Sequence, residues 1–186
     1  MVSLTSLLVP ILVSAVIVFV ASSIIHMVLR YHWSDVDTVP NETGVMEALR
    51  RFNIPPGNYM MPRPASPKDM KDPAFEEKRK QGPVALLTVL PAGPIGMGKN
   101  LAQWFVYCAV IALFAGYVAS RTLPPGASYL AVFRVVGTVA FIGFAGGLWQ
   151  ESVWWSRKWS TTLKSTIDAL IYGLLVAGTF GWLWPR

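Results

Sequence analysis

Charged residues are nearly absent from four long apolar stretches of the chain. The stretches cover residues 4–29, 101–120, 128–150 and 163–184; the first two contain no Asp, Glu, Lys or Arg, the third contains one and the fourth contains two. About 20 apolar residues in a helix span the hydrocarbon core of a bilayer, where backbone groups must pair within their own segment. The pattern therefore predicts an all-α membrane protein with four transmembrane helices at these positions.

The region between the first two stretches, residues 30–100, is rich in proline and too poor in apolar residues to form a core of its own. An amphipathic helix is predicted from about Gly44 to Phe52, with Thr43 as its N-cap, because its apolar side chains share one helical face. The prolines that follow make the run 58–64 extended. We therefore expect a single membrane domain, residues 1–186, with a long loop that carries short amphipathic helices.

Two further helix starts are visible in the same loop. Ser66-Pro67 and Asp72-Pro73 each place a capping residue before a proline at the first helical position. The second start predicts a helix that ends before Gly82-Pro83, with acidic residues early and the basic run 78–80 late, as the helix dipole favours. This helix is either a solvated structural piece or a basic patch for anionic lipid headgroups.

Composition supports the assignment to the bilayer. The chain has 186 residues, of which 53% are hydrophobic and 14% charged, and its mean hydropathy is +0.45. A soluble domain has roughly a quarter of charged residues. The first apolar stretch is too long for a signal peptide and no Lys or Arg precedes it, so we expect it to be retained as a helix. The single cysteine, Cys108, excludes an intramolecular disulfide.

The distribution of basic residues predicts the orientation. Thirteen Lys and Arg residues lie in or beside the loops 30–100 and 151–162, whereas only Arg121 and Arg186 lie on the opposite side. Cytoplasmic loops carry the excess of Lys and Arg. We therefore expect a multi-pass protein of the cell inner (plasma) membrane, with both termini outside and both basic loops cytoplasmic.

A partial nucleotide-binding motif precedes the second apolar stretch. Gly93 to Asn100 reads GPIGMGKN, close to the G-x-x-x-x-G-K-[ST] loop that cradles phosphates. Asn100 replaces the hydroxyl residue that would hold Mg²⁺, and Pro94 removes one backbone donor. No α/β domain surrounds the motif. We therefore expect no nucleotide binding here; instead, the glycines and prolines lead the chain into the membrane and Asn100 caps the second helix.

Several ionisable or polar residues lie at membrane depth, where a charge costs about 2.5 to 3.5 kcal/mol or more. The side chain of Asp168 is too short to reach the headgroups. Lys164 precedes it by four residues on the same face, so a local ion pair is one way to neutralise its charge. A polar cluster within the bundle is the candidate site, composed of His26, Gln103, Glu151, Lys164 and Asp168. Such a cluster is either a hydrogen-bond network that holds the helices in register or a relay for protons or substrate.

Arg134 and the histidines complete the candidate chemistry. Arg134 either snorkels to the outer surface or forms an outer-side site for an anion or a partner. His26 and His32 are the only histidines, and on a continuous helix they would lie about 240° apart, so a haem between them in one protomer is not expected. His32, Asp35 and Asp37 lack a recognised metal spacing. We therefore predict no metal and no cofactor.

Small residues recur at intervals of four in the last three stretches, as at Gly143 and Gly147, and allow close approach of helices. In residues 148–184, a glycine-rich helix runs into an aromatic and basic turn and then into a helix ending in Gly and Trp. This pattern resembles the last two helices of small, uncharacterised bacterial membrane proteins with four spans. The resemblance implies location and span number, and carries no functional residues.

No set of catalytic residues is present, which favours a non-catalytic integral membrane protein. The first hypothesis is a structural or accessory subunit of a membrane complex, or a self-associating bundle. The alternative is a small dimeric transporter or channel that uses Asp168 as its coupling carboxylate, and a membrane enzyme or redox subunit comes third. The expected partners are the lipid bilayer and other membrane subunits or a second copy of the chain; no nucleic acid is expected.

Overall fold

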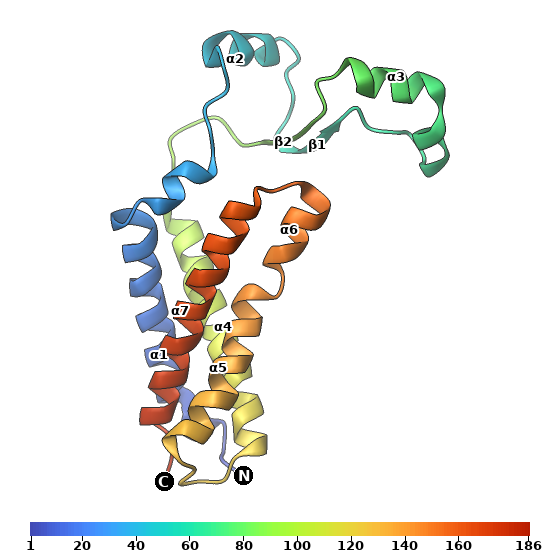
Figure 1. Ribbon diagram of the computed structural model, residues 1–186. Coiled ribbons are helices and arrows are strands. Elements are labelled where there is room, and N and C mark those ends of the chain that lie inside the picture. The colour runs from blue at the N-terminus through green and yellow to red at the C-terminus, as the bar shows by residue number, and fades with distance from the viewer. The chain divides into compact units, whose positions relative to one another are not determined.

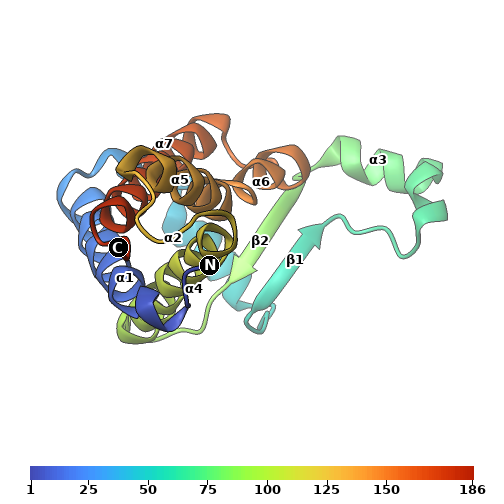
Figure 2. The ribbon, with the colours of Figure 1, turned by 90° about the horizontal axis from the view of Figure 1, so that it is seen from below.

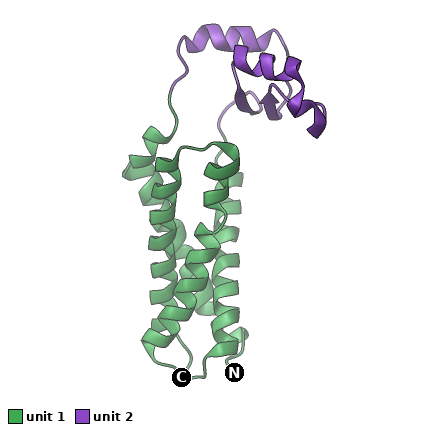
Figure 3. Cartoon of the chain, turned by 45° about the vertical axis from the view of Figure 1, so that its right-hand side comes forward, with its two compact units in different colours: residues 1–37, 96–186 green, residues 38–95 purple.

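The computed structural model describes residues 1–186, which divide into two compact units (Figure 3). The first unit comprises Met1–Asp37 and Gly96–Arg186, and the second comprises Thr38–Ile95. Four helical segments of the first unit are long and apolar enough to cross a membrane: Thr5–Val28, Gly98–Thr122, Tyr129–Trp155 and Trp159–Trp182. The chain therefore has the architecture of a mostly helical, multi-pass membrane protein.

The four segments form an antiparallel bundle (Figures 1 and 2). Helix α1 (Leu8–Ser23) contacts α4 (Gly98–Thr122) and α7 (Trp159–Trp182), and α5 (Tyr129–Ala145) contacts the same two helices from the opposite side. Both termini lie at one end of the bundle, which we call the terminal end; the other end, where α1 and α5 finish and α4 and α7 begin, is the loop end (Figure 1). Each helix thus has two neighbours and one outward face.

Glycines set the distances between these helices. A Cβ at Gly173 of α7 would lie 3.1 Å from the backbone nitrogen of Phe141 on α5, and a Cβ at Gly137 would lie 3.0 Å from the Cβ of Ala177. Gly116 of α4 likewise faces the ring of Phe180. Because nearly every one of these positions touches a neighbouring helix, the small residues are used in packing within one chain.

The outward faces of the helices are apolar. Leu12, Val16 and Val20 of α1 are about half exposed, and α4, α5 and α7 expose further large apolar side chains. Exposed apolar surface on this scale is unusual for a soluble monomer and suits contact with lipid tails. The inward faces carry smaller side chains, with alanine, glycine and valine at many of the contact positions between helices.

The helix ends differ from the predicted ones. Helix α4 begins at Gly98 with Met97 as its N-cap, so Asn100 lies inside the first turn and the prediction that it caps the helix is wrong. The third span is interrupted at Gly146 and Gly147 and continues as α6 (Leu148–Trp155). The interruption follows from local chemistry, since two consecutive glycines have low helix propensity.

The second unit contains two short helices and a β-hairpin. The helices are α2 (Glu42–Arg50) and α3 (Pro73–Gln81), and a 3₁₀ turn, Pro67–Lys71, precedes α3. Strands β1 (Gly57–Met61) and β2 (Ala85–Val89) pair antiparallel, with Gly57 opposite Val89 and Met61 opposite Ala85. The sequence predicted extended backbone for the run 58–64 but not its pairing with a second strand, so the expectation of an all-α protein is corrected in this region. Their alternating residues share one half-buried face, which is what brings them together.

The caps of these short helices follow simple rules, with one exception. Asp72 accepts a hydrogen bond from the backbone nitrogen of Ala74 at 2.9 Å, and Ser66 forms a capping box with Asp69, as predicted. Helix α2 begins two residues earlier than predicted, and its cap is Asn41 rather than Thr43. Asn41 has a left-handed backbone conformation (φ 51°), which asparagine tolerates better than most residues.

Candidate functional site

The candidate site lies at the loop end of the bundle, where the backbone after α1 departs from α-helical geometry twice. Ile24–Val28 forms a π-helical turn, and Arg30 then adopts a left-handed conformation with φ 53°. The next residues, Tyr31–Asp35, form a 3₁₀ helix that contacts α7. The two irregularities turn the chain back toward α7, so that side chains of Tyr31–Asp35 meet polar residues of that helix.

Asp168 of α7 is the buried centre of this site, with only 3% of its surface exposed. The Tyr31 hydroxyl donates a hydrogen bond to Oδ1 of Asp168, and Nε2 of His32 lies 2.7 Å from Oδ2. A carboxylate in a transmembrane helix is costly unless it is paired. Asp168 is therefore accommodated by two side chains from the segment that follows α1.

A second carboxylate, Asp35, holds the other side of His32. Its Oδ2 lies 2.6 Å from Nδ1 of His32, and its Oδ1 accepts a hydrogen bond of 2.9 Å from Nζ of Lys164. Burial alone would raise the pKa of Asp35, but the hydrogen bonds from Lys164 and His32 and their positive charges lower it to about 2. Asp35 is therefore an ionised acceptor over the physiological range.

Lys164 ties the same segment to α7 through all its hydrogen-bond donors. Besides Asp35, its ammonium donates to the backbone oxygen of Tyr31 at 2.7 Å and to the Ser34 hydroxyl at 2.8 Å. An ammonium has three donors, so each has an acceptor. An imidazolium at His32 would donate to both carboxylates, and the two anions and two cations of the group would then balance.

His26 adds a second imidazole. Its ring stacks on that of His32, with centroids 4.5 Å apart and planes 29° from parallel. One ligand-type atom from each of His26, His32 and Asp168 lies within 4.8 Å of the other two. We call the set of Tyr31, His32, Asp35, Lys164 and Asp168, together with His26, the polar cluster.

The structure brings some of the predicted site residues together and separates others. His26, Lys164 and Asp168 belong to the polar cluster, but Lys164 pairs with Asp35, so the predicted local ion pair between Lys164 and Asp168 is wrong. The reason is that the segment after α1 inserts its own carboxylate beside the ammonium. Gln103 and Glu151 have exposed side chains that hydrogen-bond to no other residue, and neither joins the cluster.

His32 was not assigned to the site from the sequence, because the 240° separation from His26 assumes an unbroken α-helix. The π-helical turn and the left-handed Arg30 break that helix, and the two rings meet. Tyr31, Ser34 and Asp35 were missed for the same reason. The available signal was the run of polar and aromatic residues directly after the first span, with Asp35 three residues beyond His32.

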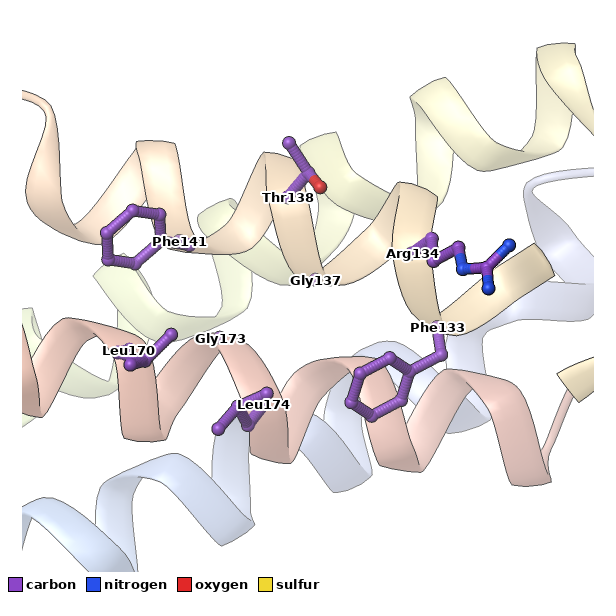
Figure 4. Close-up of a pocket in the computed structure, with 8 residues that line it drawn as sticks. All are labelled: Phe133, Arg134, Gly137, Thr138, Phe141, Leu170, Gly173 and Leu174. Atoms are coloured by element: carbon purple, nitrogen blue, oxygen red, sulfur yellow. The ribbon is translucent and has the colours of Figure 1, made fainter. Parts of the chain in front are cut away.

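Arg134 lies apart from this cluster, on α5. It borders an open groove of about 290 Å³ between α5 and α7, whose floor is made by Gly137 and Gly173 and whose other lining residues are mostly apolar (Figure 4). In Figure 4 the guanidinium lies at one end of the groove, beside Phe133, and Phe141 and Leu170 lie at the other. Arg134 is exposed and pairs with no carboxylate.

Two further polar contacts stabilise the loop end. The indole nitrogen of Trp104 donates to the Ser22 hydroxyl at 2.7 Å and so joins α4 to α1. The hydroxyls of Ser152 and Thr162 lie 2.6 Å apart and join α6 to α7. Hydrogen bonds between membrane helices contribute about 0.6 kcal/mol on average, so these contacts act mainly on geometry.

The architecture defines the class of protein as a helical membrane protein with four candidate spans. Comparison with protein-family models, with curated proteins and with solved structures finds no match to this chain. The site must therefore be interpreted from its own chemistry.

Proposed function

We propose that this protein is a non-catalytic integral membrane protein that serves as a structural or accessory subunit of a membrane complex. The observation that carries the proposal is that no side chain in Thr38–Ile95 is buried. In a segment of this length, burial of a hydrophobic core normally offsets the loss of conformational entropy. This segment has only a hairpin and short helices. A protein partner that covers it would supply the missing burial.

Helix α2 has the character of an interface. Its apolar side chains share one face and are exposed: Val45 and Leu49 by 37%, Met46 by 51%, and Phe52, just beyond the helix, by 73%. Methionine and aromatic residues are enriched in protein interfaces. The segment carries basic and acidic residues in similar numbers, eight and six, which suits a protein partner better than an anionic membrane surface that selects polybasic clusters.

Two features of the bundle favour a heterologous partner over self-association or transport. The small-residue positions that would serve a second copy, such as Gly116 and Gly173, already contact neighbouring helices of the same chain. Asp168 is held by Tyr31 and His32, whereas a coupling carboxylate must exchange its partners during a transport cycle. Transport by a dimer is the rival function.

Photo-crosslinking in the native membrane tests the proposal. A photoreactive amino acid replaces Met46 on the apolar face of α2, and the matched control replaces Glu47 on its polar face. We expect one discrete protein adduct from position 46 and a much weaker one from position 47. Adducts to lipid alone, or equal adducts from both positions, would contradict the role as a subunit.

A flux assay separates the rival function. The purified protein is reconstituted into proteoliposomes, and proton and ion flux are compared for the natural chain and Asp168→Asn. We expect no flux above that of empty vesicles for either protein. A flux that Asp168→Asn abolishes would establish transport and overturn the subunit role.

The orientation belongs to the same proposal: both termini outside the inner membrane, and Thr38–Ile95 and the turn at Arg157 in the cytoplasm, on the side with the excess of basic residues. Because Cys108 is buried, single cysteines introduced at Ser66 and Gly126 can be labelled against a low background. In intact cells we expect an impermeant maleimide to label position 126 and not position 66. The opposite labelling would reverse the orientation.

A further inference from the structure

Three potential metal ligands converge at the loop end of the bundle from three separate pieces of backbone. His26 belongs to the π-helical turn after α1, His32 to the 3₁₀ helix Tyr31–Asp35, and Asp168 to α7. Their nearest nitrogen and oxygen atoms all lie within 4.8 Å of one another. Two imidazoles and one carboxylate form a donor set that suits first-row transition metals, among them Zn²⁺ and Fe²⁺.

The distances require only side-chain adjustment. Ligand atoms around a tetrahedral ion at about 2.1 Å are about 3.4 Å apart. Nε2 of His32 and Oδ2 of Asp168 are 2.7 Å apart, and no pair in the set is farther apart than 4.8 Å. His26 is exposed and hydrogen-bonds to no side chain, so its ring can turn toward the other two ligands without breaking a hydrogen bond.

The neighbours of these ligands match the outer shell of a metal site. Asp35 binds Nδ1 of His32, which leaves Nε2 to face Asp168. The Tyr31 hydroxyl occupies Oδ1 of Asp168, which leaves Oδ2 on the side of the histidines. Carboxylates that orient a ligating histidine, and hydrogen bonds that orient a ligating carboxylate, are the usual partners of such ligands.

The backbone at this position also has a cost that helix packing does not explain. The π-helical turn Ile24–Val28 and the left-handed Arg30 are both disfavoured conformations, and both lie in the segment that brings the ring of His32 onto that of His26.

We propose that His26, His32 and Asp168 bind one divalent first-row transition-metal ion at the loop end of the bundle. The ion takes the place of the proton between Nε2 of His32 and Oδ2 of Asp168, and a neutral His26 supplies the third ligand. Three protein ligands leave a further coordination position on the exposed side of His26, for water or an exchangeable ligand. The site goes beyond the role as a subunit, and it joins the end of α1 to α7.

Cobalt binding provides a direct test, because Co²⁺ is coloured and occupies zinc sites. The full-length protein is purified in detergent, stripped with a chelator and titrated with Co²⁺ while its visible absorption is recorded; Zn²⁺ is then added as a competitor. We expect one Co²⁺ per chain, a four- or five-coordinate spectrum and complete displacement by Zn²⁺. The chain has only two histidines, so few alternative sites compete.

His26→Gln is the decisive variant, since His26 is exposed and its loss leaves the hydrogen bonds of His32 and Asp168 in place. We expect an affinity for Co²⁺ at least about ten-fold weaker, with the melting temperature of the metal-free protein unchanged. The matched control is Asp37→Asn, which removes a nearby exposed carboxylate outside the set and should bind Co²⁺ like the natural chain.

Tyr31→Phe tests the outer shell, because it removes the hydroxyl that orients Asp168. Outer-shell changes usually weaken metal binding by about 10–100-fold, and we expect an effect in that range. Equal affinity of the natural chain and His26→Gln would overturn the proposal, as would no Co²⁺ bound to the folded natural chain. An equal loss in His26→Gln and Asp37→Asn would also overturn it, because it would show diffuse binding to surface groups.

Discussion

The two units of this chain are stabilised in different ways. Met1–Asp37 and Gly96–Arg186 bury alanines, valines and glycines between helices and hold Asp35, Lys164 and Asp168 in one hydrogen-bonded cluster. Thr38–Ile95 has no fully buried side chain and relies on caps and a two-stranded hairpin. The comparison teaches that the bundle is specified by contacts between its helices, whereas the second unit depends on local structure alone.

Aspartates show the same contrast at the level of one residue type. Asp168 is almost completely buried and is bound by Tyr31 and His32. Asp72 is exposed and caps the first turn of α3. An alanine at position 168 should therefore destabilise the whole bundle, whereas an alanine at position 72 should cause a smaller loss of stability that is confined to α3.

The largest effect is expected from Asp168→Ala. This substitution leaves Nε2 of His32 and the Tyr31 hydroxyl without their acceptor, and breaking a buried charged pair typically costs about 3–5 kcal/mol. We expect a loss of this size in the free energy of unfolding of the bundle, measured by denaturant titration in detergent and followed by tryptophan fluorescence. Amide exchange in β1 and β2 should not change.

The control for this experiment is Asp37→Ala. Asp37 forms an ion pair with Lys158, but its side chain is 75% exposed, and exposed pairs contribute little. A loss from Asp37→Ala as large as that from Asp168→Ala would show that burial does not distinguish the two carboxylates.

The next effect is expected from Gly173→Val, at a close contact between α5 and α7. Its Cβ would lie 3.1 Å from the backbone of Phe141, which cannot move without shifting the helix. Overpacking typically costs about 1–3 kcal/mol. We expect a loss of stability in the upper part of this range, measured as a lower melting temperature. Gly178→Val on the same helix is the control, because its Cβ would meet only the Tyr129 hydroxyl at an ordinary 3.6 Å. Equal melting temperatures for the two variants would refute this packing.

The comparison of units also explains how far the sequence could predict the fold. Four helical segments fit the predicted spans because lipid excludes charge and requires internal hydrogen bonding over a fixed thickness. Helix ends were less predictable, as Asn41 and Asn100 show, because caps depend on backbone angles that hydropathy does not encode. The hairpin was missed because its pairing joins residues about thirty positions apart, as Asn58 and Thr88 are.

The candidate site was predictable only in part. The cost of charge in lipid marked Asp168 and Lys164 as residues that need partners. Their partners could not be read from spacing, because a π-helical turn and a left-handed Arg30 break the regular rotation of 100° per residue on which such arguments depend. The prediction that His26 and His32 lie on different faces of one helix was therefore wrong, because it assumed regular rotation where the backbone is irregular.

Acidification should lower the free energy of unfolding of the bundle, by less than Asp168→Ala or Gly173→Val does. In the metal-free protein, Lys164 and His32 lower the pKa of Asp35 from 3.8 to about 2. A depressed pKa of an acid contributes stability that is complete above the ordinary pKa and is lost as the pH falls through the lowered one, here from about 4 to about 2. Asp35 lies near the surface, where solvent screens its partners, so we expect a loss of about 1 to 2 kcal/mol.

The measurement is the unfolding free energy of the metal-free bundle between pH 6 and pH 2, compared with that of Asp35→Asn. We expect the variant to be less stable at pH 6 and to lose less stability on acidification. Parallel curves for the two proteins would show that Asp35 does not carry this part of the acid response.

The smallest effect is expected from Asp72→Ala in the second unit. The Asp72 carboxylate accepts a hydrogen bond from the backbone nitrogen of Ala74, and loss of an N-cap costs about 1 kcal/mol. Because α3 has no buried residue, this cost should be confined to the helix. We expect faster amide exchange in Pro73–Gln81, by about five-fold, and an unchanged melting temperature of the bundle. Asp72→Asn, which keeps a capping oxygen, should restore most of the protection. A lower melting temperature of the bundle in Asp72→Ala would show that the two units unfold together, because a purely local helix end cannot transmit its loss to the membrane helices.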